Sequence, residues 1–333
     1  MVSIRDIAKL ADVSVSTVSR VLNDQEHVSI EKRTRVLRAI KQTGYVPNRA
    51  ARDMVSKRTG TIGVVMPETF NMFQRQLFSS VAHHLEQFSY YTSFYFASAD
   101  VQGERACLNR LKGDRLDGII LLHEIMLGEF QTYLEENAIP TVLATFKGKE
   151  WAATSITISE EDAAQTAVNH LIALGHRDIG FIGGEKYGFA SARLDGYKRA
   201  LEGAGIAFDE QRLVRAQSYT MEGGAQATRS LLDRRVPCTA LFAITDELAL
   251  GAMRALSDRG LSVPGDMSIV GFDNIELASY SNPRLTTVSQ PIPEMGQMAV
   301  ALLYSLLSGS SGTPLSISLP TTFIERESTA RLR

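Results

Sequence analysis

Residues 4–23 constrain this chain more than any other stretch, because they contain two short amphipathic segments separated by a tight polar turn. In the first segment, apolar residues recur at helical spacing at Ile4, Ile7, Ala8 and Ala11. Asp12 and Ser14 follow, and Ser14 is placed to cap a second helix over residues 15–22. The stretch therefore predicts two helices joined by a turn.

The second predicted helix has an apolar face and a polar face. The apolar face consists of Val18, Val21 and Leu22, and the outer face of Ser16, Thr17, Ser19 and Arg20. Two helices with this turn and this polar surface form a helix-turn-helix, whose second helix enters the major groove of DNA. The pattern alone fits two helices of a small bundle equally well.

A third helix is predicted over residues 32–40, with Ser29 as its cap and Gly44 at its end. Its apolar face is expected to comprise Val36, Leu37 and Ile40. Three helices in the first 45 residues resemble a small DNA-binding domain.

Charge is unevenly distributed along the chain, although the formal net charge is only −2. Residues 1–58 contain 12 Lys and Arg against 6 Asp and Glu, whereas the rest contains 23 against 31. A basic module on an acidic body concentrates the attraction for phosphate at one end. This distribution favours the DNA-binding interpretation over the bundle.

The length of 333 residues is too great for one core and suggests two or three units. We expect neither a signal peptide nor a membrane span, since no long apolar run is present. Cys107 and Cys238 lie in unrelated segments without a second Cys at metal-ligand spacing. They are expected to be core thiols of a cytoplasmic protein that has no metal or cofactor.

After residue 59 the pattern changes to alternating strands and helices. The first set has strands at 62–66, 93–96, 118–122 and 141–144 and helices near 73–88, 104–112 and 129–137. After a helix at 160–174, the second set has strands at 179–182, 241–244 and 269–272 and helices near 192–204, 222–232 and 247–258. This order predicts an α/β fold of two parallel halves, joined near Thr157 and Gln290, with a cleft at the carboxyl ends of the strands.

Several runs resemble one known family. Residues 13–23 read Val-Ser-Val-Ser-Thr-Val-Ser-Arg-Val-Leu-Asn, and residues 44–52 read Gly-Tyr-Val-Pro-Asn-Arg-Ala-Ala-Arg. In the body, the resembling runs are 174–182, 193–197, 246–252 and 270–274, the last reading Val-Gly-Phe-Asp-Asn. In this order they resemble the lactose-repressor (LacI/GalR) family of bacterial transcription regulators.

The resemblance implies a helix-turn-helix domain at 1–45, a hinge helix or linker at 46–58 and a two-lobed, periplasmic-binding-protein-like effector domain at 59–333. Its N-lobe would comprise about 59–158 and 291–320, and its C-lobe about 159–290 and 321–333. The DNA contacts it implies are Ser14, Val15, Ser16, Thr17, Ser19, Arg20, Asn23, Asn48, Arg49 and Met54.

Within that set, Val15 and Ser16 match the positions that decide base preference. Met54 replaces the family's usual leucine and would enter the minor groove from a hinge that folds only on DNA. An ordinary linker is the alternative, since Pro47 blocks helix continuation and the segment is too short to be helical unaided.

The effector site implied by the resemblance comprises Phe73, Arg193, Tyr219, Asp246, Asp273 and Gln290. A carboxylate at a strand end can accept from two vicinal hydroxyls, and an arginine offers a planar fork of donors. Asp246 is equally well placed as a helix cap, and Gln290 could instead satisfy backbone groups. The expected effector is a sugar or sugar derivative; the alternative is a nucleoside or an acidic sugar, with Lys147 as partner for the acid.

Two other classes of protein are less consistent with the sequence. It has no Gly-rich phosphate loop, no Gly-x-Ser-x-Gly elbow and no His-Glu-x-x-His, so an enzyme is not expected. A transport receptor would share the two lobes but be exported. We therefore expect a repressor of a catabolic operon that binds double-stranded operator DNA as a homodimer, because one helix reads only a few base pairs. Residues 315–333 are expected to form one strand and a short tail, without a tetramerising coiled coil.

Overall fold

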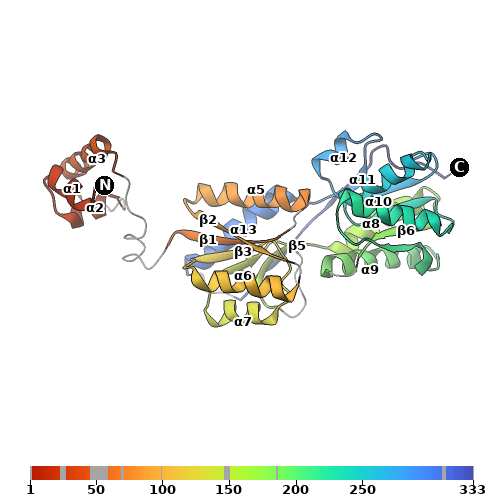
Figure 1. The fold of residues 1–333 in the computed structure, drawn as a ribbon, viewed down its shortest axis with the longest axis horizontal. Coiled ribbons are helices and arrows are strands. Elements are labelled where there is room, and N and C mark those ends of the chain that lie inside the picture. Colours follow the sequence, from red (N-terminus) through yellow and green to blue (C-terminus); the bar gives the residue numbers. More distant parts are fainter. Residues whose placement is uncertain are drawn as a thin grey trace. The chain divides into compact units, whose positions relative to one another are not determined.

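Three helices form the first of the two units into which the chain divides, Met1–Thr59 and Gly60–Arg333 (Figure 1). The computed structural model describes residues 2–22, 28–45, 59–68, 71–98, 100–145, 151–184, 187–309 and 313–332. We call the first unit the headpiece and the second the body.

The headpiece helices are α1 (Ile4–Leu10), α2 (Val15–Leu22) and α3 (Ile30–Thr43). Ser3 and Asp6 form a capping box that satisfies backbone donors at the start of α1. The predicted apolar faces of the first two helices are confirmed, with these residues buried together: Ile7, Ala8, Ala11, Val18 and Val21. The core of this unit therefore follows from helical periodicity.

The predicted apolar face of α3 was partly wrong. Leu37 is 53% exposed, and Ala39 is buried beside Val36 instead. Both positions lie within one turn of Val36, so periodicity alone cannot choose between them, and packing against α1 and α2 does. Gly44 ends the helix in the left-handed region at φ 62°, where a residue without Cβ is favoured.

The body contains two six-stranded sheets. The first has the order β11-β5-β4-β3-β1-β2, and every pair in it is parallel. Its strands are β1 (Thr61–Pro67), β2 (Tyr91–Ala97), β3 (Gly118–Leu121), β4 (Thr141–Leu143), β5 (Thr154–Ile158) and β11 (Ser316–Leu319). The helices packed on it are α5 (Met72–Gln87), α6 (Val101–Gly113), α7 (Gly128–Glu136) and α13 (Ile292–Leu307) (Figure 1). We call this sheet with its helices the N-lobe.

The second sheet has the order β12-β10-β9-β8-β6-β7, and only β12 is antiparallel to its neighbour among the described strands. Its strands are β6 (Ile179–Gly183), β7 (Leu213–Arg215), β8 (Ala240–Ala243), β9 (Ser268–Asp273), β10 (Thr286–Ser289) and β12 (Thr322–Ile324). The accompanying helices are α8 (Glu160–Ala173), α9 (Gly188–Gly203), α10 (Met221–Asp233), α11 (Asp246–Asp258) and α12 (Glu276–Tyr280), with the short 3₁₀ turn η1 (Glu210–Arg212). We call this sheet with its helices the C-lobe.

The chain passes between the lobes three times, after β5, after β10 and between β11 and β12. The seven strands predicted in the two sets are all present, and β10 lies where a crossover strand was expected, next to Gln290, whereas β5, β7 and α13 were not predicted. The C-terminal stretch was expected to hold one strand, but it holds two short ones in different sheets. The missed strands are only three to five residues long, which gives too little periodicity to recognise them.

Each sheet is buried by apolar side chains. Apolar clusters cover both faces of the first sheet, and the second sheet shares one large cluster with the helices on its two sides. Buried parallel strands of this kind end at an edge where the loops are exposed to ligands. Among the described residues, none of the helices combines the length and the hydropathy needed to span a bilayer.

Candidate functional site

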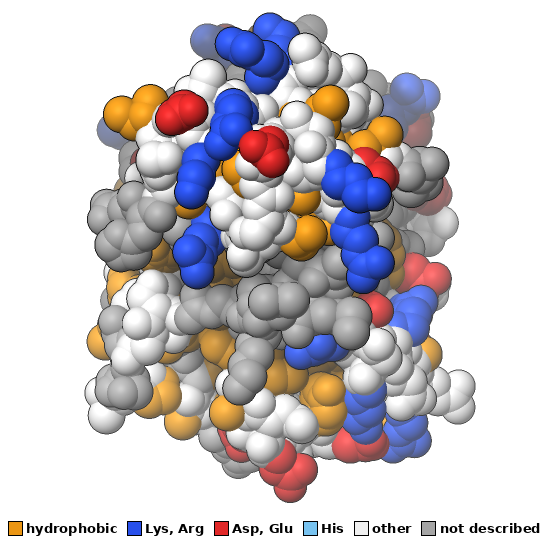
Figure 2. Space-filling model, turned by 90° about the vertical axis from the view of Figure 1, so that its left-hand side faces the viewer, with side chains coloured by type: hydrophobic (Ala, Val, Ile, Leu, Met, Phe, Trp, Pro, Cys, Tyr) orange, Lys and Arg blue, Asp and Glu red, His pale blue; other side chains and the backbone are white. Residues whose placement is uncertain are grey.

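The outer surface of α2 presents the residues predicted to contact DNA. Ser14 caps the helix as predicted, since its Oγ accepts a hydrogen bond from the backbone N–H of Thr17 at 3.2 Å. Val15, Ser16 and Arg20 are exposed, while Thr17 and Ser19 are half-buried. Figure 2 shows one face of the molecule, on which several Lys and Arg side chains stand out. Polar side chains and a guanidinium on an exposed helix can reach base edges and phosphates.

Some predicted contacts cannot be placed. The residues Asn23, Asn48, Arg49 and Met54, with the whole hinge segment 46–58, lie outside the described residues. Lys147, the candidate partner for an acidic ligand, also lies outside them.

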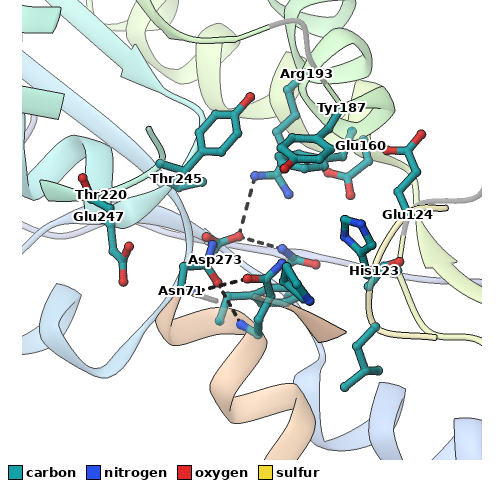
Figure 3. A pocket seen from close by; sticks show the side chains of 18 of the residues that line it. Asn71, His123, Glu124, Glu160, Tyr187, Arg193, Thr220, Thr245, Glu247 and Asp273 are labelled. Atoms are coloured by element: carbon teal, nitrogen blue, oxygen red, sulfur yellow. Dashed lines mark hydrogen bonds and ion pairs between the residues drawn. The ribbon is translucent and has the colours of Figure 1, made fainter. Parts of the chain in front are cut away.

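A cavity of about 590 Å³ lies between the two lobes of the body (Figure 3). Its wall is built from segments that follow the carboxyl ends of strands in both sheets, as expected for an open parallel α/β fold. Five of the six predicted effector residues line it: Phe73, Arg193, Tyr219, Asp273 and Gln290. The fold therefore brings together residues that are separated by more than 200 positions in the sequence.

Arg193, in the second turn of α9, is the central cation of the cavity. Its Nε donates a hydrogen bond to Glu160 Oε2 at 2.7 Å, and its Nη1 lies 3.6 Å from Asp273 Oδ1. Figure 3 shows its side chain pointing toward Asp273. The guanidinium stacks on the ring of Phe272, 3.5 Å from its centroid. Arg193 is only 3% exposed, so packing and ion pairs hold its planar fork in one orientation.

Asp273 ends β9 in an unusual backbone conformation. Its φ is 118°, a region that residues other than glycine rarely adopt, and such strain is concentrated at functional sites. Its Oδ1 accepts a hydrogen bond from Gln290 Nε2 at 2.7 Å. Burial raises the pKa of the Asp273 carboxyl well above its ordinary value, and the neighbouring Arg193 opposes that rise. Gln290 thus orients a carboxylate that faces the cavity.

Asp246 is the one predicted effector residue that the structure does not place in the cavity wall. It is fully buried beneath the wall, where its Oδ2 accepts from the Ile275 backbone N–H at 2.8 Å and its Oδ1 from Thr287 Oγ1 at 2.5 Å. A side chain on Gly271 would collide with this carboxylate. The helix cap of α11 is Thr245, not Asp246. Asp246 therefore holds the segment after Asp273 in place.

Three aromatic rings form one side of the cavity. Tyr187 and Phe189 are stacked at 5.5 Å between centroids, and Tyr219 lies 5.8 Å from each of them. Such faces pack against the apolar face of a sugar ring or against a nucleobase. Tyr219 was predicted here, whereas Tyr187 and Phe189 were not. Tyr187 caps α9 and Phe189 lies in its first turn, so both belong to the segment that follows the carboxyl end of β6, where ligand-contacting residues are expected.

Two glutamates connect the lobes at the cavity. Glu124, after β3 of the N-lobe, accepts a hydrogen bond from the backbone N–H of Gly188 in α9 of the C-lobe at 2.8 Å. Glu247, in α11 of the C-lobe, accepts from the backbone N–H of Met72 in α5 of the N-lobe at 3.0 Å. Figure 3 shows the two carboxylates on opposite sides of the cavity. Burial raises the pKa of both carboxyls.

His123 also lines the cavity, next to Glu124. It is 3% exposed, and its Nε2 lies 3.5 Å from Glu104 Oε1 without a hydrogen-bond partner among the described residues. Glu104 instead accepts from the backbone N–H groups of Met126 and Leu127. No group of three or more His, Cys, Asp or Glu in the described ranges is arranged to hold a metal ion. The described lining of the cavity combines carboxylic acids, aromatic rings and one arginine.

The class of protein follows from this arrangement together with two family matches. Residues 3–48 match the model for bacterial regulatory proteins of the lacI family, and residues 168–329 match a periplasmic binding protein-like domain. The chain belongs to the LacI family of bacterial regulatory proteins, which confirms the resemblance and the predicted fold class. It is a DNA-binding transcriptional regulator and not an enzyme.

Individual relatives match over nearly the whole length. The chain is 35% identical to catabolite control protein A of Priestia megaterium over 98% of this chain and 99% of that protein. It matches a lac repressor dimer bound to operator and the anti-inducer ONPF with 29% identity, a TM-score of 0.88 and 99% coverage of both chains. It matches the complex of the transcriptional regulator CelR with cellobiose with 30% identity and a TM-score of 0.74, over 98% of this chain and 100% of that chain.

Proposed function

We propose that this protein is a repressor of a catabolic operon, and that a sugar or sugar derivative bound in the cavity between the lobes controls its affinity for operator DNA. Residues 1–45 bind DNA, residues 46–58 form the hinge, and residues 59–333 bind the effector and dimerise. It acts in the cytoplasm, on DNA of the nucleoid. The operator and cellobiose in the structures of its relatives favour these partners.

The observation that carries the effector proposal is the pairing of Arg193 and Asp273, 3.6 Å apart, beside an aromatic wall. A carboxylate and a guanidinium at fixed separation can bind neighbouring hydroxyls of a sugar, while the rings cover its apolar face. Because the cavity is shared by the lobes, a ligand that binds one arrangement of the lobes better shifts the population toward it.

The hinge is the proposed relay from the body to the DNA. Residues 46–58 fold on the operator, and Met54 enters the minor groove at its centre. Lobe movement that separates two such hinges in the dimer removes their mutual packing and weakens operator binding.

The test begins with thermal unfolding of the full chain in the presence of sugars and nucleosides, because a ligand that binds only the folded state raises the midpoint. The ligand found is then titrated into Arg193→Lys and into the control Arg199→Lys, which changes a half-buried arginine of the same helix that does not line the cavity. Arg193→Lys retains the charge but loses the planar fork, so its affinity should fall about tenfold or more.

Operator binding without effector should be the same for both variants and the wild type. If Arg193→Lys responds to the effector with an unchanged midpoint, Arg193 is structural and the effector site lies elsewhere.

A further inference from the structure

Most of the ionisable side chains in the described part of the cavity wall are acidic. The described lining contains four carboxylates and one guanidinium, and these residues are Glu124, Glu160, Glu247, Asp273 and Arg193. The positive charge of Arg193 is already divided between two of the acids, since Nε bonds to Glu160 and Nη1 lies 3.6 Å from Asp273. Acidic side chains therefore outnumber Lys and Arg in the described wall.

The other two acids accept hydrogen bonds from backbone donors, and the nearby charge of Arg75 also opposes the rise in the pKa of Glu247. Glu124 accepts from the N–H of Gly188, and Glu247 accepts from the N–H of Met72, each at the first residue of a helix. A helix N-terminus offers only a partial positive charge, equivalent to about half an elementary charge. Neither contact supplies a full compensating positive charge, so each side of the cavity keeps an acidic group that disfavours a further anion.

We infer that this cavity selects its ligand by charge, accepting neutral or amine-bearing polyhydroxy compounds and rejecting sugar phosphates, uronic acids and nucleotides. The inference rests on the proposed function, and it narrows the ligand class of the same site. A like charge brought next to desolvated carboxylates raises the free energy of the complex. Burial already raises the pKa of Glu124, Glu160 and Glu247, and an added anion would disfavour their charged forms further.

The aromatic side chains of the cavity also disfavour anionic ligands. Tyr187, Phe189 and Tyr219 surround one side of the cavity with ring centroids 5.5 to 5.8 Å apart. The faces of aromatic rings carry negative charge density, which attracts ammonium groups and repels anions. An amine on the ligand is therefore tolerated or preferred, whereas a carboxylate or phosphate meets repulsion from rings and acids alike.

The experiment measures binding of matched sets of compounds to the full chain by thermal shift and calorimetry. Each set joins a neutral compound to its charged counterparts: glucose with glucosamine, glucuronate and glucose 6-phosphate, ribose with ribose 5-phosphate, cellobiose with cellobiuronic acid, and cytidine with cytidine monophosphate. In any set that binds, the anionic members should bind at least about tenfold more weakly than the neutral or amine-bearing one. An anionic member that binds as tightly as its neutral counterpart overturns the inference.

Variants that remove a single negative charge distinguish electrostatic repulsion of an anionic ligand from a poor steric fit of that ligand. Glu124→Gln and Glu247→Gln keep an oxygen that can accept the backbone hydrogen bond but remove the negative charge. Each should reduce the ratio of neutral to anionic affinity severalfold, whereas Glu136→Gln, at an exposed position of α7, should leave it unchanged. If the ratio is the same in all three variants, the carboxylates do not set the selectivity.

The same binding measurements distinguish a failure of this inference from a failure of the proposed function. If no member of any set raises the unfolding midpoint, the carbohydrate proposal itself falls. If only anionic members raise the unfolding midpoint, the cavity does bind a ligand, and only the inferred selection against anions is wrong.

Discussion

Glu247 and Met72 lie 175 residues apart in the sequence, yet the carboxylate of the first accepts the backbone N–H of the second at 3.0 Å. Glu124 and Gly188 repeat this contact in the opposite direction between the lobes. The first N–H groups of a helix have no partner within the helix, so each carboxylate satisfies a donor in the other lobe. The two contacts hold the lobes in the arrangement seen around the cavity.

Removing either carboxylate should loosen that arrangement. Glu247→Ala is expected to speed hydrogen exchange of the Met72 amide about tenfold, and Glu124→Ala that of the Gly188 amide, because each deletes a charge-assisted hydrogen bond. Hydrogen-exchange mass spectrometry of the full chain measures both. The Gln variants, which retain an acceptor, should remain near wild type. If both amides exchange at the wild-type rate in both Ala variants, these contacts do not hold the lobes.

Asp246 should make the stability of the body depend on pH. Burial raises the pKa of Asp246 to about 6 from 3.8, so the folded state binds a proton that the unfolded state releases. The stability contributed by this group is complete below about pH 4 and is lost as the pH rises through about 6, a change of roughly 3 kcal/mol.

Asp246→Asn keeps an oxygen to accept from Ile275 and cannot ionise. Its unfolding midpoint should therefore fall less than that of the wild type between pH 4.5 and pH 7.5, as measured by calorimetry. If the unfolding midpoints of the two proteins change equally with pH, Asp246 does not ionise in this range.

The surface of α2 should read the operator. Arg20→Ala is expected to weaken binding, and the logarithm of wild-type affinity should fall steeply with the logarithm of salt concentration, because phosphate contacts release counterions. Ser16→Ala should instead change the preference among operator variants, since Ser16 is exposed on the face of α2 that we predict to enter the major groove.

The matched control for the headpiece is Ser29→Ala, because the Ser29 side chain makes no capping hydrogen bond to α3. Fluorescence anisotropy across a salt series measures all three variants. A salt-independent wild-type affinity would exclude binding dominated by phosphate contacts.

The edge strand β2 is the expected dimer surface on the N-lobe. Three aromatic side chains on it are exposed, Tyr91, Phe94 and Phe96. Apolar edge strands left uncovered invite pairing with another chain, and the repressor relative bound to operator is a dimer. Phe94→Lys should therefore shift the sedimentation coefficient toward a monomer and weaken operator binding, whereas Phe208→Lys, an exposed phenylalanine of the C-lobe, should not. An unchanged dimer in Phe94→Lys places the interface elsewhere.

Local patterns in the sequence determined most of the headpiece core and the alternation of strands and helices, whereas the family resemblance supplied the five predicted residues that line the cavity. Val18 and Val21 are buried because helical periodicity puts them on one face, and Asp273 reaches the cavity because it ends a buried strand. These properties depend on neighbours within a few residues, so they can be read without the tertiary structure.

Only the tertiary structure distinguished carboxylates that look alike in the sequence. Asp246 and Glu247 are adjacent, yet one is buried beneath the wall and the other bonds to a helix in the opposite lobe. Glu124 and Glu160 received no role from local pattern, because their partners Gly188 and Arg193 lie more than 30 residues away. The environment of a charged group is set by everything packed around it, and that packing exists only once the two sheets and their crossovers have formed.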